Sequence, residues 1–195
     1  QRGHCYLPRP ELLERAATLL GQPQELLVGA LADLFSSGRA VAEGSRIWAP
    51  DLHQAELRVV ERLTTLRNTR AVALDLDIPS ALQWAEERSG ITLTAGQREA
   101  LAQALVNKVV VITGGPGTGK TTLIRALLDI WQRKGLVPSL AAPTGRAARR
   151  LEEATGRKAS TLHRLLEFSP KNARFLRDGE APLTTGAAVV DEASM

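Results

Sequence analysis

The first 50 residues repeat an amphipathic pattern. Apolar residues recur at helical spacing over residues 10–20 and again over residues 24–35, which predicts two helices. Gly21 follows the first of them, where a helix commonly ends. Apolar and polar residues then alternate on both sides of Glu43–Gly44, which predicts a β-hairpin. We therefore expect a small, mostly helical domain over residues 1–50.

Two helices followed by a β-hairpin are similar to a winged helix, which is a common nucleic-acid-binding module. The same elements would serve equally well as a spacer that touches no DNA. Neither predicted helix is rich in Lys or Arg, which favours the spacer. Both interpretations stay open from the sequence.

The pattern changes twice after residue 50. Residues 51–90 are mostly helical, with a break near Asp75–Pro79, and predict a helical connector. From residue 91 to residue 195, short and nearly continuous apolar runs alternate with helical patterns, which predicts an α/β domain with a parallel sheet covered on both faces. The strands expected in this domain are Val109–Thr113, Pro138–Ala142 and Ala187–Asp191.

Composition restricts the class of protein. Hydrophobic residues make up 44% and charged residues 24% of the 195 positions, which is ordinary for a globular chain. No uncharged apolar stretch reaches the length of about 18 residues that a membrane span needs, so we expect no membrane partner. The single cysteine allows no internal disulfide and favours a reducing, cytoplasmic location. Because the first residue is Gln1 rather than Met, we expect this chain to be part of a longer protein.

The run VVITGGPGTGKTTL, residues 110–123, carries the strongest chemical signal. Gly114, four residues and then Gly119-Lys120-Thr121 form the P-loop pattern between a predicted strand and a predicted helix. Glycines let successive backbone N–H groups surround a nucleotide phosphate, and the next helix directs its positive end at it. We expect Lys120 to reach the β- and γ-phosphates and Thr121 to join the Mg²⁺ ligands. The predicted nucleotide-binding residues are Gly115, Pro116, Gly117, Thr118, Gly119, Lys120, Thr121 and Thr122.

An acidic pair follows the last predicted strand. The segment AAVVDEASM places Asp191 at the end of the apolar run and Glu192 directly after it. Downstream of a P-loop, Asp191 is expected to hold Mg²⁺ and Glu192 to orient and deprotonate an attacking water. The predicted catalytic residues are therefore Glu192, Lys120 and Asp191, and the predicted metal ligands are Thr121 and Asp191.

A second anion site is expected after the second strand. Pro143-Thr144-Gly145 lies between that strand and a predicted helix over Arg146–Ala154, so Thr144 and the first helical N–H groups would face an anion. A further helix is expected after Ser160 or Thr161, with His163 in its first turn.

Positive charge is concentrated in the same part of the chain. Residues 146–177 contain nine Lys and Arg residues against three Glu residues, a net charge of +6, whereas the whole chain has +4. Two helix ends within a basic stretch would hold a phosphodiester backbone without reading its sequence. A solvated helix face explains the charge equally well.

Four segments, in this order, resemble motifs I, Ia, Ib and II of superfamily 1 DNA helicases: GGPGTGKTT, AAPTGRAARRL, STLHRLL and VVDEASM. The resemblance is to the RecD group, particularly stand-alone bacterial RecD-like helicases, motif by motif over residues 91–195 and more loosely near the N-terminus. It implies a RecA-like P-loop fold, ATP and Mg²⁺ as cofactors, 5′-to-3′ translocation on single-stranded DNA and unwinding at duplex junctions in repair or recombination.

The resemblance also assigns roles by position. It assigns phosphate binding to Lys120, Mg²⁺ binding to Thr121 and Asp191, and the role of catalytic base to Glu192, as the residues alone also predict. It further implies that Thr144, Arg146 and His163 lie in motifs that touch DNA. Gln97 falls where these helicases have an adenine-recognising glutamine. The residues alone predict instead that Gln97 closes a capping box with Thr94 at the start of a helix. The resemblance favours adenine contact, and one amide is able to do both.

Two other functions are alternatives to the helicase. An AAA+ ATPase has a similar P-loop but no PTGRAA and STLHRLL block, and a nucleotide-gated DNA-binding module needs no base such as Glu192. The family's second RecA-like domain is expected elsewhere in the same protein, together with the arginine finger that it supplies. We therefore expect residues 1–195 alone to be nearly inactive.

Overall fold

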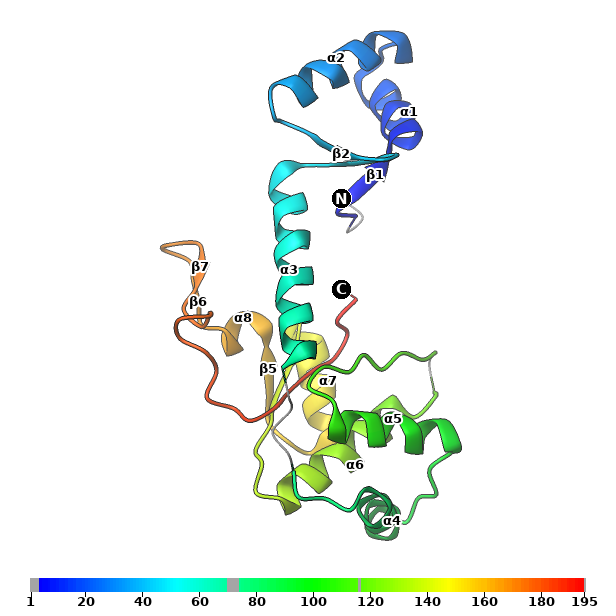
Figure 1. Ribbon diagram of the computed structural model, residues 1–195, viewed down its shortest axis with the longest axis vertical. Coiled ribbons are helices and arrows are strands. Elements are labelled where there is room, and N and C mark those ends of the chain that lie inside the picture. Colours follow the sequence, from blue (N-terminus) through cyan, green and yellow to red (C-terminus); the bar gives the residue numbers. More distant parts are fainter. Residues whose placement is uncertain (1–3, 70–73, 116, 195) are drawn as a thin grey trace. The chain divides into compact units, whose positions relative to one another are not determined.

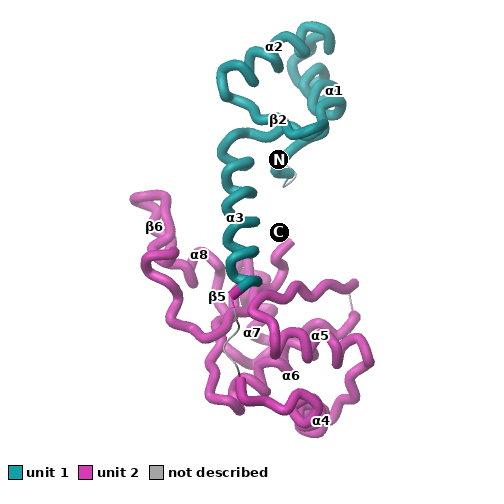
Figure 2. The backbone as a smooth tube through the Cα atoms, viewed as in Figure 1, with its two compact units in different colours: residues 1–68 teal, residues 69–195 magenta. Residues whose placement is uncertain are grey.

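The computed structural model describes residues 4–69, 74–115 and 117–194 (Figure 1). The chain forms two compact units, residues 1–68 and residues 69–195 (Figure 2). Within the described residues, no helix is both long and apolar enough to cross a membrane. The division into three domains predicted above stays a prediction.

Unit 1 contains the predicted helices and hairpin. Its elements are β1 (Tyr6–Pro8), α1 (Arg9–Leu20), α2 (Gln24–Ser36), β2 (Val41–Glu43), β3 (Arg46–Trp48) and α3 (Pro50–Asn68). The strands form an antiparallel sheet in the order β1-β3-β2, with a left-handed Gly44 in the turn of the hairpin. Gly21 ends α1 in the left-handed conformation, as predicted. Strand β1 was not predicted from the sequence, and the winged-helix interpretation stays a prediction.

Trp48 is the centre of the small core of unit 1. The side chain is only 3% exposed, its ring lies 5.2 Å from those of Tyr6 and His53, and its Nε1 donates to Glu56 Oε2 at 2.8 Å. His53 in turn contacts Glu43 Oε1 at 2.9 Å through Nε2. These residues pack and bond within unit 1, so Trp48 serves as a packing residue.

Unit 2 is an α/β structure with a parallel sheet. Its helices are α4 (Ile78–Ser89), α5 (Ala95–Val106), α6 (Lys120–Arg133), α7 (Gly145–Thr155) and α8 (Leu162–Leu165). Its strands are β4 (Ser139–Ala142), β5 (Ala159–Thr161), β6 (Phe168–Ser169), β7 (Arg174–Phe175) and β8 (Ala188–Val190). The order β5-β4-β8 is parallel throughout, and β6 and β7 form a separate antiparallel hairpin. The predicted second and third strands and the incomplete RecA-like fold class are confirmed.

Helix α6 lies at the centre of the core of unit 2. Leu128 and Ile130 of α6 and Leu101 of α5 are at most 1% exposed, and Leu140 of β4 packs into the same cluster. Full burial of such side chains contributes roughly 1.5–3 kcal/mol each. Trp131 is also buried, again as a packing residue. The helix that follows the P-loop is therefore firmly anchored in the core of the unit.

Polar caps fix the ends of two helices that lead towards α6. The Asp77 carboxylate caps α4, and hydrogen bonds from the side chain and the amide of Ser80 hold the pKa of that carboxyl below its usual value. Thr94 caps α5, with Gln97 completing the predicted capping box. The helical break predicted near Asp75–Pro79 is confirmed by the start of α4 at Ile78.

The strand predicted at Val109–Thr113 is wrong. These residues are described but carry no strand assignment, and the described part of the sheet ends at β8. Ile112 packs against the core whereas Val111 is 82% exposed. A run of apolar residues provides side chains for burial, but a strand also requires backbone hydrogen bonds to a neighbouring strand. Here Ile112 reaches the core although its segment forms no such ladder with a described strand.

Candidate active site

The P-loop is built on glycines that its geometry requires. Gly119 stands at the N-cap of α6 with φ +83°, in the left-handed region that favours glycine. A Cβ atom on Gly119 would lie 2.4 Å from Gln97 Nε2, and one on Gly114 would lie 2.6 Å from Thr118 Oγ1. Side chains at these two positions would therefore collide with the contacts that shape the loop.

Lys120 folds back onto the loop. Its Nζ donates to the carbonyl oxygens of Gly114 and Gly115 at 2.6 and 2.8 Å. Thr118 Oγ1 donates to the Gly115 oxygen at 2.9 Å and braces the same turn. The cation predicted to meet phosphate therefore lies at the loop backbone, where a phosphate oxygen would replace carbonyl oxygens as its partner.

The start of α6 is open to an anion. Gly119 provides no side-chain cap, and the first turn contains no acidic residue, so the first N–H groups of this 14-residue helix face no competing carboxylate of their own turn. Thr121 is exposed and Thr122 half-buried in that turn. The predicted phosphate-binding residues that the structure describes, Gly115 and residues 117–122, lie in this loop and turn. Pro116 lies outside the described residues, and Gln97, predicted to contact adenine, lies on α5.

Gln97 connects the loop to α5. Its side-chain Oε1 accepts from the backbone amide of Thr94 at 3.0 Å, and its backbone amide donates to Thr94 Oγ1 at 3.3 Å. Its side-chain Nε2 donates to the backbone oxygen of Thr118 at 3.0 Å. The capping box is confirmed, and the loop contact is one that the sequence did not reveal. Among the described residues, one N–H and one lone pair of the Gln97 side-chain amide have no partner, so adenine contact stays a prediction.

Three parallel strands bring the other predicted residues to one edge of the sheet. Thr144 follows β4, Asp191 follows β8, and Thr161 ends β5 directly before α8. Because β5, β4 and β8 are parallel neighbours, their carboxyl ends lie at the same edge. Ligands of open α/β sheets bind outside this edge, so the topology supports a shared site there.

The acidic pair is held by the backbone of that edge. The Asp191 amide donates to the Ala141 oxygen at 2.9 Å, which extends the β8–β4 ladder by one residue. The Glu192 amide donates to Asp191 Oδ1 at 3.0 Å, and Glu192 has φ +53°, a value uncommon outside glycine. Asp191 is half-buried and Glu192 exposed.

Glu192 also has a partner that the sequence did not suggest. Its Oε1 lies 3.6 Å from an Arg150 nitrogen, and both side chains are largely exposed. Arg150 stands 42 positions before Glu192 in the printed sequence, so only the β4–α7 topology brings the two together. No short motif would have found this pair.

The predicted DNA-binding residues lie on or after this edge. Thr144 caps α7, since its Oγ1 accepts from the Ala147 amide at 3.2 Å, and Arg146 is exposed in the first turn. Thr161 is the cap of α8, which decides between the two predicted cap residues. His163 is exposed, and its ring lies 5.2 Å from Phe168 and 5.5 Å from Phe175.

The loop and the acidic pair are not joined directly. Within the described ranges, no hydrogen bond or ion pair connects the P-loop to Asp191 or Glu192. A pocket of about 530 Å³ lies beside α6 and shares only Thr122 with the predicted nucleotide set. Its charged lining comes from Arg88, Arg125, Arg157 and Asp129.

The donor set fits a hard cation that is held in part by a nucleotide. The described residues contain no group of three or more His, Cys, Asp or Glu side chains that would hold a metal alone. Thr121 and Asp191 supply hydroxyl and carboxylate oxygens, which Mg²⁺ prefers, and Mg²⁺ commonly completes its shell with phosphate oxygens and water. The loop has matching features, because the Lys120 cation and the uncapped α6 amides stand where phosphates would lie.

Comparison with known proteins gives consistent relatives. Residues 97–195 match the family described as AAA domain. The chain is 36% identical over 211 residues to the ATP-dependent RecD2 DNA helicase of Deinococcus radiodurans, across 100% of this chain and 28% of that protein. It is 42% identical over 122 residues to the RecBCD enzyme subunit RecD of Mycobacterium tuberculosis (strain CDC 1551 / Oshkosh), across 51% of this chain and 21% of the subunit. It is 38% identical over 84 residues to the ATP-dependent DNA helicase dda of Enterobacteria phage T4, across 40% and 19% of the two chains.

These relatives favour the helicase interpretation over the AAA+ alternative. The chain spans 28% of the length of the RecD2 relative and 21% of the RecD relative. The family model covers half of the chain and includes the P-loop, the β4–α7 segment and the acidic pair. The chain therefore belongs to this AAA domain family and, within it, to the RecD-like superfamily 1 DNA helicases.

Proposed function

We propose that this chain provides the first ATPase domain of an ATP-dependent DNA helicase that moves on single-stranded DNA. The observation that carries the proposal is the P-loop, in which a left-handed Gly119, a backbone-bound Lys120 and the uncapped start of α6 face one anion site. The relatives support it, because the RecD2 and dda proteins are named ATP-dependent DNA helicases.

In the proposed mechanism, the loop binds the triphosphate of ATP. The backbone N–H groups of residues 117–121 surround the β-phosphate, and the α6 dipole favours its negative charge. Lys120 leaves the Gly114 and Gly115 oxygens for β- and γ-phosphate oxygens, so one set of charge-assisted bonds replaces another. Gln97 bonds to Thr118 and so orients the loop, and we assign its unused N–H and lone pair to the adenine.

The acidic edge carries out hydrolysis. Thr121 and Asp191 would hold Mg²⁺, which neutralises charge on the phosphates when it is bound. Glu192 orients a water and accepts its proton as the water oxygen attacks the γ-phosphorus and the bond to the ADP oxygen breaks. The second RecA-like domain of the complete protein is proposed to supply the arginine finger, which in P-loop enzymes is worth about 10³–10⁵ in rate.

Single-stranded DNA is proposed to run along the carboxyl edge of the sheet and the adjoining helices. Thr144 and Arg146 at the start of α7 would meet phosphates, and exposed His163, together with the neighbouring rings of Phe168 and Phe175, offers a ring surface for a base. Movement from 5′ to 3′, action at duplex junctions, and a role in repair or recombination belong to this proposal.

Lys120→Ala in the complete protein tests the proposal. We expect ATP hydrolysis in the presence of DNA to fall by about 10²-fold or more, because an oxyanion contact of this kind is worth about that much. Lys108→Ala is the matched control, since Lys108 is an exposed lysine that precedes the loop. If Lys120→Ala hydrolysed ATP at the same rate as Lys108→Ala and the parent, the proposed nucleotide site would be refuted.

A further inference from the structure

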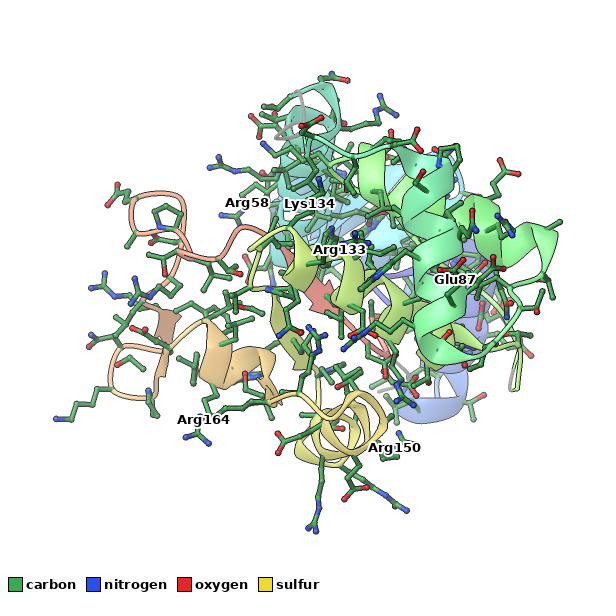
Figure 3. The ribbon with its side chains drawn as sticks, turned by 90° about the horizontal axis from the view of Figure 1, so that it is seen from below. Arg58, Glu87, Arg133, Lys134, Arg150 and Arg164 are labelled. Atoms are coloured by element: carbon green, nitrogen blue, oxygen red, sulfur yellow. The ribbon has the colours of Figure 1, made fainter. Side chains whose placement is uncertain are left out.

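We infer that Arg150 is a positioning residue that restrains Glu192 until DNA engages α7. The inference rests on the proposed function, because it assumes that Glu192 is the base and that the start of α7 meets DNA. The observation behind it is the ion pair between Arg150 and Glu192 Oε1, which joins a surface helix to the end of β8 (Figure 3 labels Arg150 on α7).

Glu192 is held on its backbone side by β8. Asp191 continues the β8–β4 ladder through its amide, and its Oδ1 accepts from the Glu192 amide at 3.0 Å. The left-handed φ of +53° fixes the direction in which the Glu192 side chain leaves the strand. The ion pair therefore acts on a side chain whose backbone attachment is already fixed.

The backbone of Arg150 is held in place by the packing of α7. Ala147, Ala148 and Leu151 on the buried face of α7 are at most 4% exposed, so the helix is packed as a unit on the sheet. Arg149, the preceding residue, pairs with Glu153 of the same helix at 3.0 Å. Of these two neighbouring arginines, Arg150 alone connects α7 to the acidic pair.

The geometry suits a restraint that opens easily. The side chains of Arg150 and Glu192 are 62% and 42% exposed, and ion pairs this exposed are weak. The attraction between the Arg150 guanidinium and Glu192 Oε1, 3.6 Å apart, favours this position of the Glu192 side chain over the others that it could adopt to reach an attacking water. Since α7 begins at Thr144, a shift of this helix on binding a phosphate backbone would separate the pair and free Glu192.

The test compares Arg150→Ala, Arg150→Lys and Arg149→Ala in the complete protein with the parent. ATP hydrolysis is measured without DNA and with saturating single-stranded DNA. We expect Arg150→Ala to raise the DNA-free kcat by about fivefold, the most that an exposed pair of this kind is worth. The KM for ATP and the DNA-stimulated kcat should stay within about twofold of the parent. Arg150→Lys should restore most of the restraint, and Arg149→Ala should match the parent.

Each outcome decides the inference. An unchanged DNA-free rate in Arg150→Ala would show that the pair has no role, and a fall in both rates would show that Arg150 assists catalysis instead of restraining it. Glu192→Gln, measured in parallel, distinguishes a failure of the proposed function from a failure of the restraint alone. If Glu192→Gln hydrolyses ATP like the parent, Glu192 is not the base, and both the proposed mechanism and the restraint are wrong.

Discussion

The P-loop and the acidic edge of the sheet are built in different ways. The loop is made by residues that follow one another, since Gly114, Gly115, Thr118 and Lys120 bond among themselves. The acidic edge is assembled from β4, α7 and β8, with Ala141, Arg150 and Glu192 brought together by the sheet. A contiguous motif can be recognised in the sequence. An edge assembled from several strands depends on the strand order and on contacts between distant residues, which no short sequence pattern predicts.

Glu192→Gln should give the largest effect and tests the assembled edge. Loss of a general base costs about 10²–10⁴ in kcat, while the loop should still bind nucleotide. DNA-stimulated ATP hydrolysis and binding of a fluorescent ATP analogue are measured on the complete protein. Glu180→Gln, an exposed carboxylate elsewhere in unit 2, is the control. Equal loss of binding and hydrolysis in Glu192→Gln would mean that loop and edge do not act separately.

Gly119→Ala should give the next largest effect and tests the contiguous loop. The substitution forces an L side chain into φ +83° and places its Cβ 2.4 Å from Gln97 Nε2. We expect a loss of about 1–2 kcal/mol in the free energy of unfolding, from the left-handed backbone, together with weaker ATP binding. Urea denaturation and nucleotide titration measure the two quantities.

Gly96→Ala provides the control for that substitution. Gly96 lies in the first turn of α5 without a left-handed φ, and a Cβ added there would have no described atom within 4 Å beyond its chain neighbours and the backbone of its own helix. Alanine there should leave stability unchanged or raise it by up to about 1 kcal/mol. If both glycine variants behave alike, the loop geometry does not require Gly119.

The smallest effect separates the two roles of Gln97. Thr94→Ala removes the α5 cap and should cost about 1 kcal/mol in unfolding free energy without changing base preference. Gln97→Ala removes the reciprocal cap bond and the Thr118 contact, and should also reduce the preference for ATP over GTP. Hydrolysis of both nucleotides and thermal melting are compared for the two variants. An unchanged ATP preference in Gln97→Ala would leave Gln97 with the structural role alone.

Much of the fold followed from local chemistry. Gly21 and Gly44 were expected where the chain needs a left-handed residue, and Thr94 and Thr144 cap their helices through side-chain oxygens. The apolar runs that became β4 and β8 each found a parallel neighbour. Such features depend on residues within a few positions of one another, so a sequence pattern is sufficient to predict them.

The features that the sequence did not reveal depend on distant partners. Val109–Thr113 has the composition of a strand but pairs with no described strand, because pairing is decided by the neighbouring chain and not by the run itself. The Gln97–Thr118 and Arg150–Glu192 contacts also join separate elements. Motif matching located both halves of the candidate site, and the structure added the contacts that surround them.

The position of the Lys120 side chain in a complex with nucleotide tests the central claim most directly. A crystal structure of the complete protein with Mg²⁺ and a non-hydrolysable ATP analogue should show the backbone amides of residues 117–121 on the β-phosphate. Lys120 Nζ should lie within hydrogen-bond distance of β- and γ-phosphate oxygens, having left the Gly114 and Gly115 oxygens. A structure in which the analogue binds elsewhere while Lys120 keeps both carbonyl contacts would contradict the account.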